Sequence, residues 1–177
     1  MQEEVIVAGF GGQGIMFMGR LLAHAAMQEN KNVTFFPSYG AEMRGGTANC
    51  TVVISDEEIG SPVVKHPHSI IVLNQPSTDR FLPRIKDKGI LVVNSSLVHD
   101  IDKRDGINIV KIEASRIAES LGEKKVANMV AVGSYIKKTG ILKLVSLKES
   151  LKILLGEKKK NLIDINIKAL EHGYNKY

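Results

Sequence analysis

The chain has 177 residues and a mass of 19.4 kDa, a length typical of one domain that can bury a full apolar core. Apolar residues make up 44% of the chain and charged residues 24%, as in ordinary globular proteins, and the formal net charge is +5. The single cysteine excludes a disulfide framework, and it excludes an iron–sulfur cluster or structural zinc site held by this chain's own cysteines.

The N-terminal sequence Met-Gln-Glu-Glu is acidic and unlike a signal peptide, and the sequence contains no run of 18 apolar residues. A lone cysteine also agrees with a reducing compartment. We therefore expect a cytoplasmic protein that makes no contact with a membrane.

The first 36 residues predict a β–loop–α–β unit. A short apolar strand over residues 5–8 is followed by the run Gly9-Phe10-Gly11-Gly12-Gln13-Gly14. Apolar residues then recur at helical spacing from Ile15 to Ala26, and residues 33–36 predict a second strand.

Further strands are expected after an irregular segment, separated by connections and a helix that begins at Asn74-Gln75-Pro76. These strands cover residues 47–54, 69–73, 89–93 and 107–112. Strands alternating with helices predict an α/β fold with a doubly wound, mostly parallel, Rossmann-like sheet.

The remainder of the sequence predicts helices, over residues 113–121, 124–139, 146–155 and 158–172. Gly140 and Gly156 stand where helices should end. We expect a single domain over residues 1–177, with a sheet core over about 4–140 and a C-terminal helical extension over about 141–177.

The stretch 137–177 holds ten lysines and four acidic residues, a net charge of +6, which leaves the rest of the chain close to neutral. A basic segment can bind nucleic acid or an acidic partner. Here the lysines alternate with leucines at helical spacing, which favours a solvated helical surface. Because few aromatic residues accompany the lysines, we expect no binding of nucleic acid.

The glycine run after the first strand satisfies the pattern G-x-G-x-x-G at Gly9, Gly11 and Gly14. Such glycines allow a tight turn, the approach of a pyrophosphate and close packing of the helix on the strand. The second strand ends in Phe-Phe-Pro-Ser, without the acidic residue that binds the ribose of NAD, and no P-loop lysine follows the glycines. The loop therefore indicates an anion site unlike that of NAD, or else close helix–strand packing alone.

A second polar loop, residues 38–46, begins where the second strand ends. It contains the hydroxyl of Ser38, the phenol of Tyr39, the carboxylate of Glu42 and the guanidinium of Arg44. The carboxyl edge of an α/β sheet is where ligands bind, and an arginine can hold a phosphate or carboxylate with two hydrogen bonds. The alternative is that Glu42 and Arg44 form an ion pair that only fixes the loop.

No catalytic residue and no metal site stand out. Cys50 lies inside a predicted strand and is expected to behave as a small buried apolar residue. His66 and His68 lack a third ligand nearby. Ser95 and Ser96 end a strand at the ligand-binding edge, where they either contact a ligand or cap a turn, and we expect the cap.

Three motifs together resemble the gamma subunit of 2-oxoacid:ferredoxin oxidoreductases. They are Gly-Phe-Gly-Gly-Gln-Gly-Ile at residues 9–15, Ser-Tyr-Gly-Ala-Glu-Met-Arg-Gly-Gly-Thr at residues 38–47, and Asn-Met-Val-Ala-Val-Gly at residues 128–133. The likeness extends from about residue 4 to about residue 140.

This resemblance implies a subunit of an enzyme that converts a 2-oxoacid and coenzyme A to acyl-CoA, CO2 and reduced ferredoxin. It implies thiamine diphosphate, magnesium and iron–sulfur clusters in partner subunits only, with alpha, beta and delta subunits and ferredoxin as partners. The gamma subunit would help bind CoA and cover the active site, and would be inactive alone. The 2-oxoacid would be 2-oxoglutarate or a branched-chain 2-oxoacid. The implied cofactor-binding residues are Gly9, Gly11, Gly12, Gln13, Gly14, Ser38 and Arg44.

Two other functions compete with this interpretation. A stand-alone nucleotide-binding Rossmann-like protein of the dehydrogenase class would need a ribose acid and a proton-transfer residue near the glycine loop, and the sequence offers neither. A nucleic-acid-binding protein would use the lysine-rich tail and would lose affinity steeply with salt.

Overall fold

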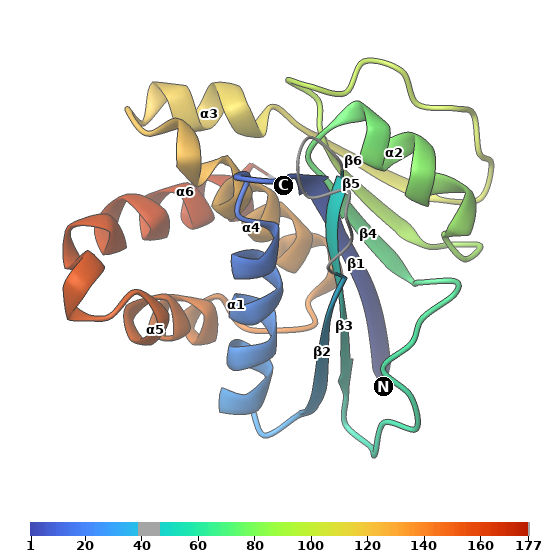
Figure 1. Ribbon diagram of the computed structural model, residues 1–177, viewed down its shortest axis with the longest axis horizontal. Coiled ribbons are helices and arrows are strands. Elements are labelled where there is room, and N and C mark those ends of the chain that lie inside the picture. The colour runs from blue at the N-terminus through green and yellow to red at the C-terminus, as the bar shows by residue number, and fades with distance from the viewer. Residues whose placement is uncertain (39–46, 177) are drawn as a thin grey trace.

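The computed structural model describes residues 1–38 and 47–176 (Figure 1). Its strands are β1 (Gln2–Phe10), β2 (Asn32–Ser38), β3 (Thr47–Ser55), β4 (Ser69–Val72), β5 (Ile90–Asn94) and β6 (Asn108–Ile112). Its α-helices are α1 (Ile15–Gln28), α2 (Gln75–Phe81), α3 (Ala114–Ser120), α4 (Ala127–Thr139), α5 (Leu144–Leu155) and α6 (Ile163–Asn175), with 3-10 turns η2 (Leu82–Arg84), η3 (Lys124–Val126) and η4 (Glu157–Leu162). Each strand and helix predicted from the sequence is present, with ends that differ by a few residues.

The strands form one sheet in the order β2-β3-β1-β4-β5-β6. Strands β1, β4, β5 and β6 pair in parallel, whereas β3 runs antiparallel to both of its neighbours, β1 and β2. Every strand except β3 therefore runs in the same direction, which confirms the mostly parallel α/β sheet. The β2–β3 hairpin places β3, rather than β2, next to β1.

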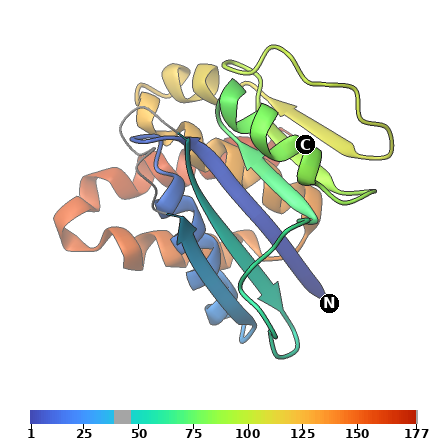
Figure 2. The same cartoon turned by 45° about the vertical axis from the view of Figure 1, so that its right-hand side comes forward.

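Helices cover the two faces of the sheet unequally, as Figures 1 and 2 show: α1, α4, α5 and α6 lie on one side and α2 on the other. Along β1, Val5 and Val7 belong to the larger core, and Ile6 and Ala8 belong to the smaller core under α2. Successive side chains of a strand point to opposite faces, so a strand covered on both faces needs the unbroken apolar run found here.

Local signals set the helix ends. The side chain of Asn74 accepts a hydrogen bond from the backbone nitrogen of Ser77 at 2.9 Å and caps α2, and Pro76 occupies the first turn. Gly140 and Gly156 end α4 and α5 with φ angles of 62° and 58°, a region that favours glycine. The predicted helix start and both predicted helix ends are confirmed.

Helices α4 and α6 cross in close contact because each contributes a glycine. A Cβ atom on Gly133 would lie 2.7 Å from the backbone nitrogen of Tyr174, and one on Gly173 would lie 2.7 Å from the carbonyl carbon of Val130. The hydroxyl of Ser134 donates to the carbonyl oxygen of Gly173 at 3.0 Å or to that of Val130 at 3.2 Å. This crossing holds the C-terminal helix firmly on α4, which itself packs on the sheet.

A buried polar pair connects α4 to β1. The hydroxyl of Tyr135, which is fully buried, donates a hydrogen bond to Oε1 of Glu3 at 3.2 Å. Desolvation raises the pKa of Glu3 and, together with the Glu3 carboxylate, raises the pKa of Tyr135 well above its ordinary value.

The lysine-rich C-terminal part packs through its apolar side. Leu147 and Leu151 of α5 and Leu170 of α6 are fully buried, whereas Lys152 and Lys168 are exposed. This arrangement agrees with the predicted solvated lysine surface. In the described part of the chain, no helix is long and apolar enough to cross a bilayer.

Candidate functional site

The glycine loop leaves the carboxyl end of β1 and leads directly into α1. Gly12 and Gly14 have φ angles of 93° and 76°, which residues with a side chain rarely adopt. A Cβ atom on Gly9 would lie 2.7 Å from Cδ1 of Ile15, and one on Gly14 would overlap the amide nitrogen of Asn128. By contrast, no atom lies within 4 Å of a Cβ position on Gly12, and Gly11 is also exposed. Gly9 and Gly14 therefore serve packing, whereas Gly11 and Gly12 leave backbone open to a ligand.

The side chain of Gln13 stabilises the conformation of the glycine loop through hydrogen bonds. Its Oε1 atom accepts a hydrogen bond from the backbone nitrogen of Phe10 at 2.6 Å, and its Nε2 atom donates to the carbonyl oxygen of Leu73 at 3.4 Å. Nδ2 of Asn74 also donates to Oε1 of Gln13 at 3.4 Å. The side-chain amide thus joins the glycine loop to the end of β4, which gives this predicted cofactor-binding residue a positioning role in the chain itself.

The second predicted loop starts at the same edge of the sheet, two strands away from the glycine loop. Ser38 is exposed and pairs with Asn49 of β3, while Phe10 pairs with Thr47. Because neighbouring strands lie about 5 Å apart, β3 separates Ser38 from β1 by about 10 Å. Arg44 lies outside the described residues, as do Tyr39 and Glu42.

Asn128 is a site residue that the sequence-based reasoning noticed within a motif but did not assign to the site. It lies in the first turn of α4, is only 6% exposed, and its Oδ1 accepts a hydrogen bond from the backbone nitrogen of Met129 at 2.8 Å. Its Nδ2 atom packs against Gly14, where a Cβ atom would overlap it, and it has no acceptor among the described residues. The Asn-Met-hydrophobic motif was the signal that could have identified it.

Two cavities meet at Gly12, Lys125 and Asn128. The smaller, of about 170 Å³, lies at the carboxyl edge of the strands and also contacts Asn94 and Ser115. This is the reversal point of the sheet, between β1 and β4, where open α/β sheets bind ligands. The larger, of about 310 Å³, lies behind the glycine loop between α1, α5, α6 and residues 123–128.

Cationic groups surround these cavities. Arg20, Lys125 and Lys159 line the larger one and have no carboxylate partner among the described residues, and Glu123 is the acidic residue beside them. Lys124, on the smaller cavity, forms a 2.7 Å ion pair with Glu119, whose hydrogen bond raises the pKa of that lysine. The surroundings of the glycine loop thus favour an anionic ligand.

The residues that were discounted have structural roles. Cys50 is fully buried, and desolvation raises the pKa of its thiol to about 12, so it stays protonated at neutral pH and does not suit a metal or cluster. The hydroxyl of Ser96 accepts a hydrogen bond from the backbone nitrogen of Arg116 in α3 at 3.3 Å, and within the turn after β5 it is Oδ1 of Asn94 that accepts from the backbone nitrogen of Ser96. His66 is exposed. Over residues 1–38 and 47–176 no group of three His, Cys, Asp or Glu side chains is placed to bind a metal ion.

The chain is similar to known proteins in both sequence and fold. Residues 4–176 match the family described as pyruvate ferredoxin/flavodoxin oxidoreductase. The ketoisovalerate oxidoreductase subunit VorA of Methanothermobacter marburgensis is 38% identical over 174 residues, which make up 97% of this chain and 36% of VorA. The 2-oxoglutarate synthase subunit KorC of Methanocaldococcus jannaschii is 36% identical over 178 residues, which cover 98% of this chain and 93% of KorC.

A solved structure agrees with these relatives. The gamma subunit of a keto/oxoacid ferredoxin oxidoreductase from Geobacter sulfurreducens superposes with a TM-score of 0.86 at 27% identity, covering 98% of this chain and 97% of that one. The present chain thus corresponds to nearly all of KorC and of this gamma subunit, and to 36% of the length of VorA. The expected resemblance is confirmed: the chain belongs to the pyruvate ferredoxin/flavodoxin oxidoreductase family and is similar to its gamma subunits along almost its entire length.

Proposed function

We propose that this chain acts as the gamma subunit of a 2-oxoacid:ferredoxin oxidoreductase that converts a 2-oxoacid and CoA to acyl-CoA, CO2 and reduced ferredoxin. The substrate would be 2-oxoglutarate or a branched-chain 2-oxoacid, the two classes named for KorC and VorA. Within this enzyme the chain would help bind CoA and cover the active site. It would not itself carry out the oxidation.

The observation that carries this proposal is the open backbone at Gly11 and Gly12 beside unpaired cations. A phosphate can approach the loop there, because no atom of the described chain fills the space above Gly12 and Lys125 lies on both adjacent cavities. The ribose acid of a NAD site has no equivalent here, because β2 ends in Phe-Phe-Pro-Ser without an acidic residue and β3 separates its end from β1. The missing acid argues against a stand-alone NAD-dependent enzyme.

The redox cofactors would reside in partner subunits. Thiamine diphosphate with magnesium would supply the decarboxylation, and iron–sulfur clusters would carry electrons to ferredoxin. The one thiol of this chain is buried and protonated, which suits neither group. Alpha, beta and delta subunits would therefore be required, and exposed apolar side chains such as Phe36 (49% exposed) and Met27 (59% exposed) offer contact surface for them.

Arg44 tests the CoA part of this proposal. In the assembled enzyme, Arg44→Ala should raise the KM for CoA by about ten-fold, because a charge-assisted hydrogen bond to a phosphate contributes roughly 1.5–3 kcal/mol. The KM for the 2-oxoacid should stay constant. Arg116→Ala, which removes an arginine paired with Glu113 on α3, is the control. An unchanged KM for CoA in Arg44→Ala would remove Arg44 from the site.

A further inference from the structure

We propose that the outer face of α5 and α6 is a docking surface for a small acidic protein, the ferredoxin that the enzyme reduces. This inference rests on the proposed function and adds to it the part of this chain that contacts the electron acceptor. We call this surface the basic face and define it by five exposed side chains, namely Lys143, Val145, Lys152, Ile153 and Lys168.

Helices α5 and α6 lie in the part of the molecule farthest from α2, as Figures 1 and 2 show. The 3-10 turn η4 connects the two helices, and Lys148 of α5 forms an ion pair with Glu171 of α6. The fully buried Leu151 holds α5 on the core, and the crossing of Gly133 with Gly173 holds α6 on α4. The basic face therefore has a fixed support, which lowers the entropy that binding costs.

Lysines exceed acidic residues on this part of the chain. Residues 137–177 hold ten lysines and four acidic residues, and the rest of the chain is close to neutral. Three of the four acids pair with lysines of the same segment, namely Glu149 with Lys152, Glu157 with Lys160, and Glu171 with Lys148. Lys143 and Lys168 are exposed and have no carboxylate partner among the described residues. This excess of positive charge complements an acidic protein surface.

Two apolar side chains interrupt the charged surface of α5. Val145 is 59% exposed and Ile153 is 58% exposed, and the exposed ion pair of Glu149 and Lys152 lies between them in the sequence. Their separation of eight residues corresponds to about 12 Å along the helix. Apolar contacts with a charged rim are typical of protein interfaces, whereas a nucleic acid would bind the lysines through its phosphates and leave both apolar side chains without a partner.

The composition of the basic face favours a partner that binds and leaves. Permanent subunit interfaces are large and apolar, and lysine is depleted in them because its ammonium group is strongly hydrated. Small contacts are typical of electron-transfer encounters, and complementary charge speeds such association. In the proposed reaction, ferredoxin is the protein that must dissociate after each reduction. A second copy of the basic face would be repelled by like charge.

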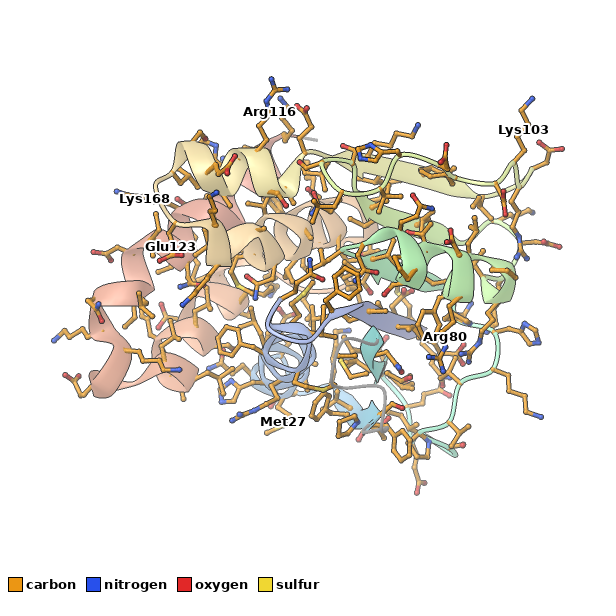
Figure 3. The ribbon with its side chains drawn as sticks, turned by 45° about the horizontal axis from the view of Figure 1, so that its top comes forward. Met27, Arg80, Lys103, Arg116, Glu123 and Lys168 are labelled. Carbon is orange, nitrogen blue, oxygen red and sulfur yellow. The ribbon has the colours of Figure 1, made fainter. Side chains whose placement is uncertain are left out.

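The test measures ferredoxin reduction by the assembled enzyme after charge reversal on the basic face. Ferredoxin from the same cells is varied at saturating 2-oxoacid and CoA, at low and at high ionic strength. The variants are Lys143→Glu and Lys168→Glu, with Lys103→Glu as the matched control. Lys103 is also exposed and without a carboxylate partner in the described part of the chain, and Figure 3 shows it at the opposite end of the molecule from Lys168. Methyl viologen, a small artificial electron acceptor, reports whether each variant complex is otherwise intact.

We expect Lys143→Glu and Lys168→Glu each to raise the KM for ferredoxin by about five-fold at low ionic strength, because each reverses a charge that attracts an acidic protein. The effect should shrink at high ionic strength, since salt screens exposed charges. The kcat, the KM for CoA and the rate with methyl viologen should stay constant. Lys103→Glu should match the unmodified enzyme.

Four other results would overturn the inference. If all three variants give the same KM for ferredoxin, ferredoxin docks elsewhere and the proposed function survives. If charge reversal on the basic face lowers the native mass of the complex or its rate with methyl viologen, the face binds a partner subunit. If RNA of random sequence binds the unmodified complex but not Lys168→Glu, and the KM for ferredoxin is unchanged, the face binds nucleic acid. If the unmodified complex reduces neither ferredoxin nor methyl viologen with a 2-oxoacid and CoA, the proposed function fails as well.

Discussion

Glycine serves opposite purposes at the α4–α6 crossing and at the glycine loop. At the crossing, Gly133 and Gly173 let two backbones touch, and a Cβ atom on either would meet backbone atoms of the other helix. At the loop, Gly12 has a positive φ and empty space above it. The helix crossing therefore has no space even for a methyl group on Gly133 or Gly173, whereas the backbone at Gly12 has room for a ligand.

Polar groups follow the same division. Next to the crossing, the Tyr135 hydroxyl and the Glu3 carboxyl satisfy each other inside the protein. Beside the loop, Nδ2 of Asn128 has no partner among the described residues and is open to solvent. The Tyr135–Glu3 hydrogen bond therefore joins two segments of the fold, whereas the Asn128 amide can still bind a ligand.

Gly173→Ala should have the largest effect on stability. Its Cβ would overlap the carbonyl oxygen of Val130 and force the helices apart, at a cost of about 3 kcal/mol in the free energy of unfolding. Urea unfolding would measure it, with Gly60→Ala as the control because Gly60 has open space and no positive φ. Equal stability of the two variants would show that the crossing is not tight.

Gly14→Ala should have the next largest effect and lower the free energy of unfolding by about 2 kcal/mol. This substitution combines backbone strain at a positive φ with displacement of the Asn128 amide. Gly122→Ala is a matched control, since Gly122 also has a positive φ, of 86°, but nothing within 4 Å. The difference between the two variants in urea unfolding isolates the contact with Asn128. Equal free energies of unfolding for the two variants would mean that the Asn128 side chain can move away from residue 14 at no cost.

Gly12→Ala should separate stability from binding. Its Cβ meets no atom, so the strained backbone alone should lower the free energy of unfolding by about 1 kcal/mol. The methyl group would project where a ligand phosphate approaches, so CoA affinity of the assembled complex should fall by about ten-fold, which corresponds to about 1.4 kcal/mol. Unaltered CoA affinity would show that this backbone faces no ligand.

Glu3→Gln should have the smallest effect, visible mainly as a change in pH dependence. Burial raises the pKa of Glu3 in the folded chain, so the protonated carboxyl favours folding at low pH. This contribution is complete below the pKa of glutamate in the unfolded chain and is lost as the pH rises through the folded pKa. Unfolding free energies measured from about pH 4 to about pH 8 should fall more steeply for the unmodified chain than for Glu3→Gln. Parallel curves would contradict a raised pKa.

The sequence predicted the features that depend on neighbouring residues. Unbroken apolar runs located β1 and β4, the Asn74-Gln75-Pro76 cap located the start of α2, and Gly140 marked the end of α4. Each of these signals acts within one or two turns or along one strand, so it can be recognised without knowledge of the tertiary fold.

Features that join distant segments could not be predicted in the same way. The place and direction of β3 follow from pairings such as Phe10 with Thr47, and the approach of Asn128 to Gly14 follows from packing of α4 behind the glycine loop. Ser38 follows the second strand in the sequence but lies two strands away from the glycine loop, because β3 is inserted between β2 and β1 and strand order is set by the whole sheet. The single-domain organisation, the cytoplasmic location and the CoA contacts of the glycine loop, Ser38 and Arg44 stay predictions.

The most direct test of the proposed function is to purify the chain from its own cells under argon and to record its native mass and visible absorbance. We predict a large complex, coloured brown by iron–sulfur clusters, whose absorbance bleaches when a 2-oxoacid and CoA are added together. The 2-oxoacid that bleaches it fastest would identify the substrate. A small, colourless oligomer that does not respond to these additions would contradict the proposed role as a subunit of a 2-oxoacid:ferredoxin oxidoreductase.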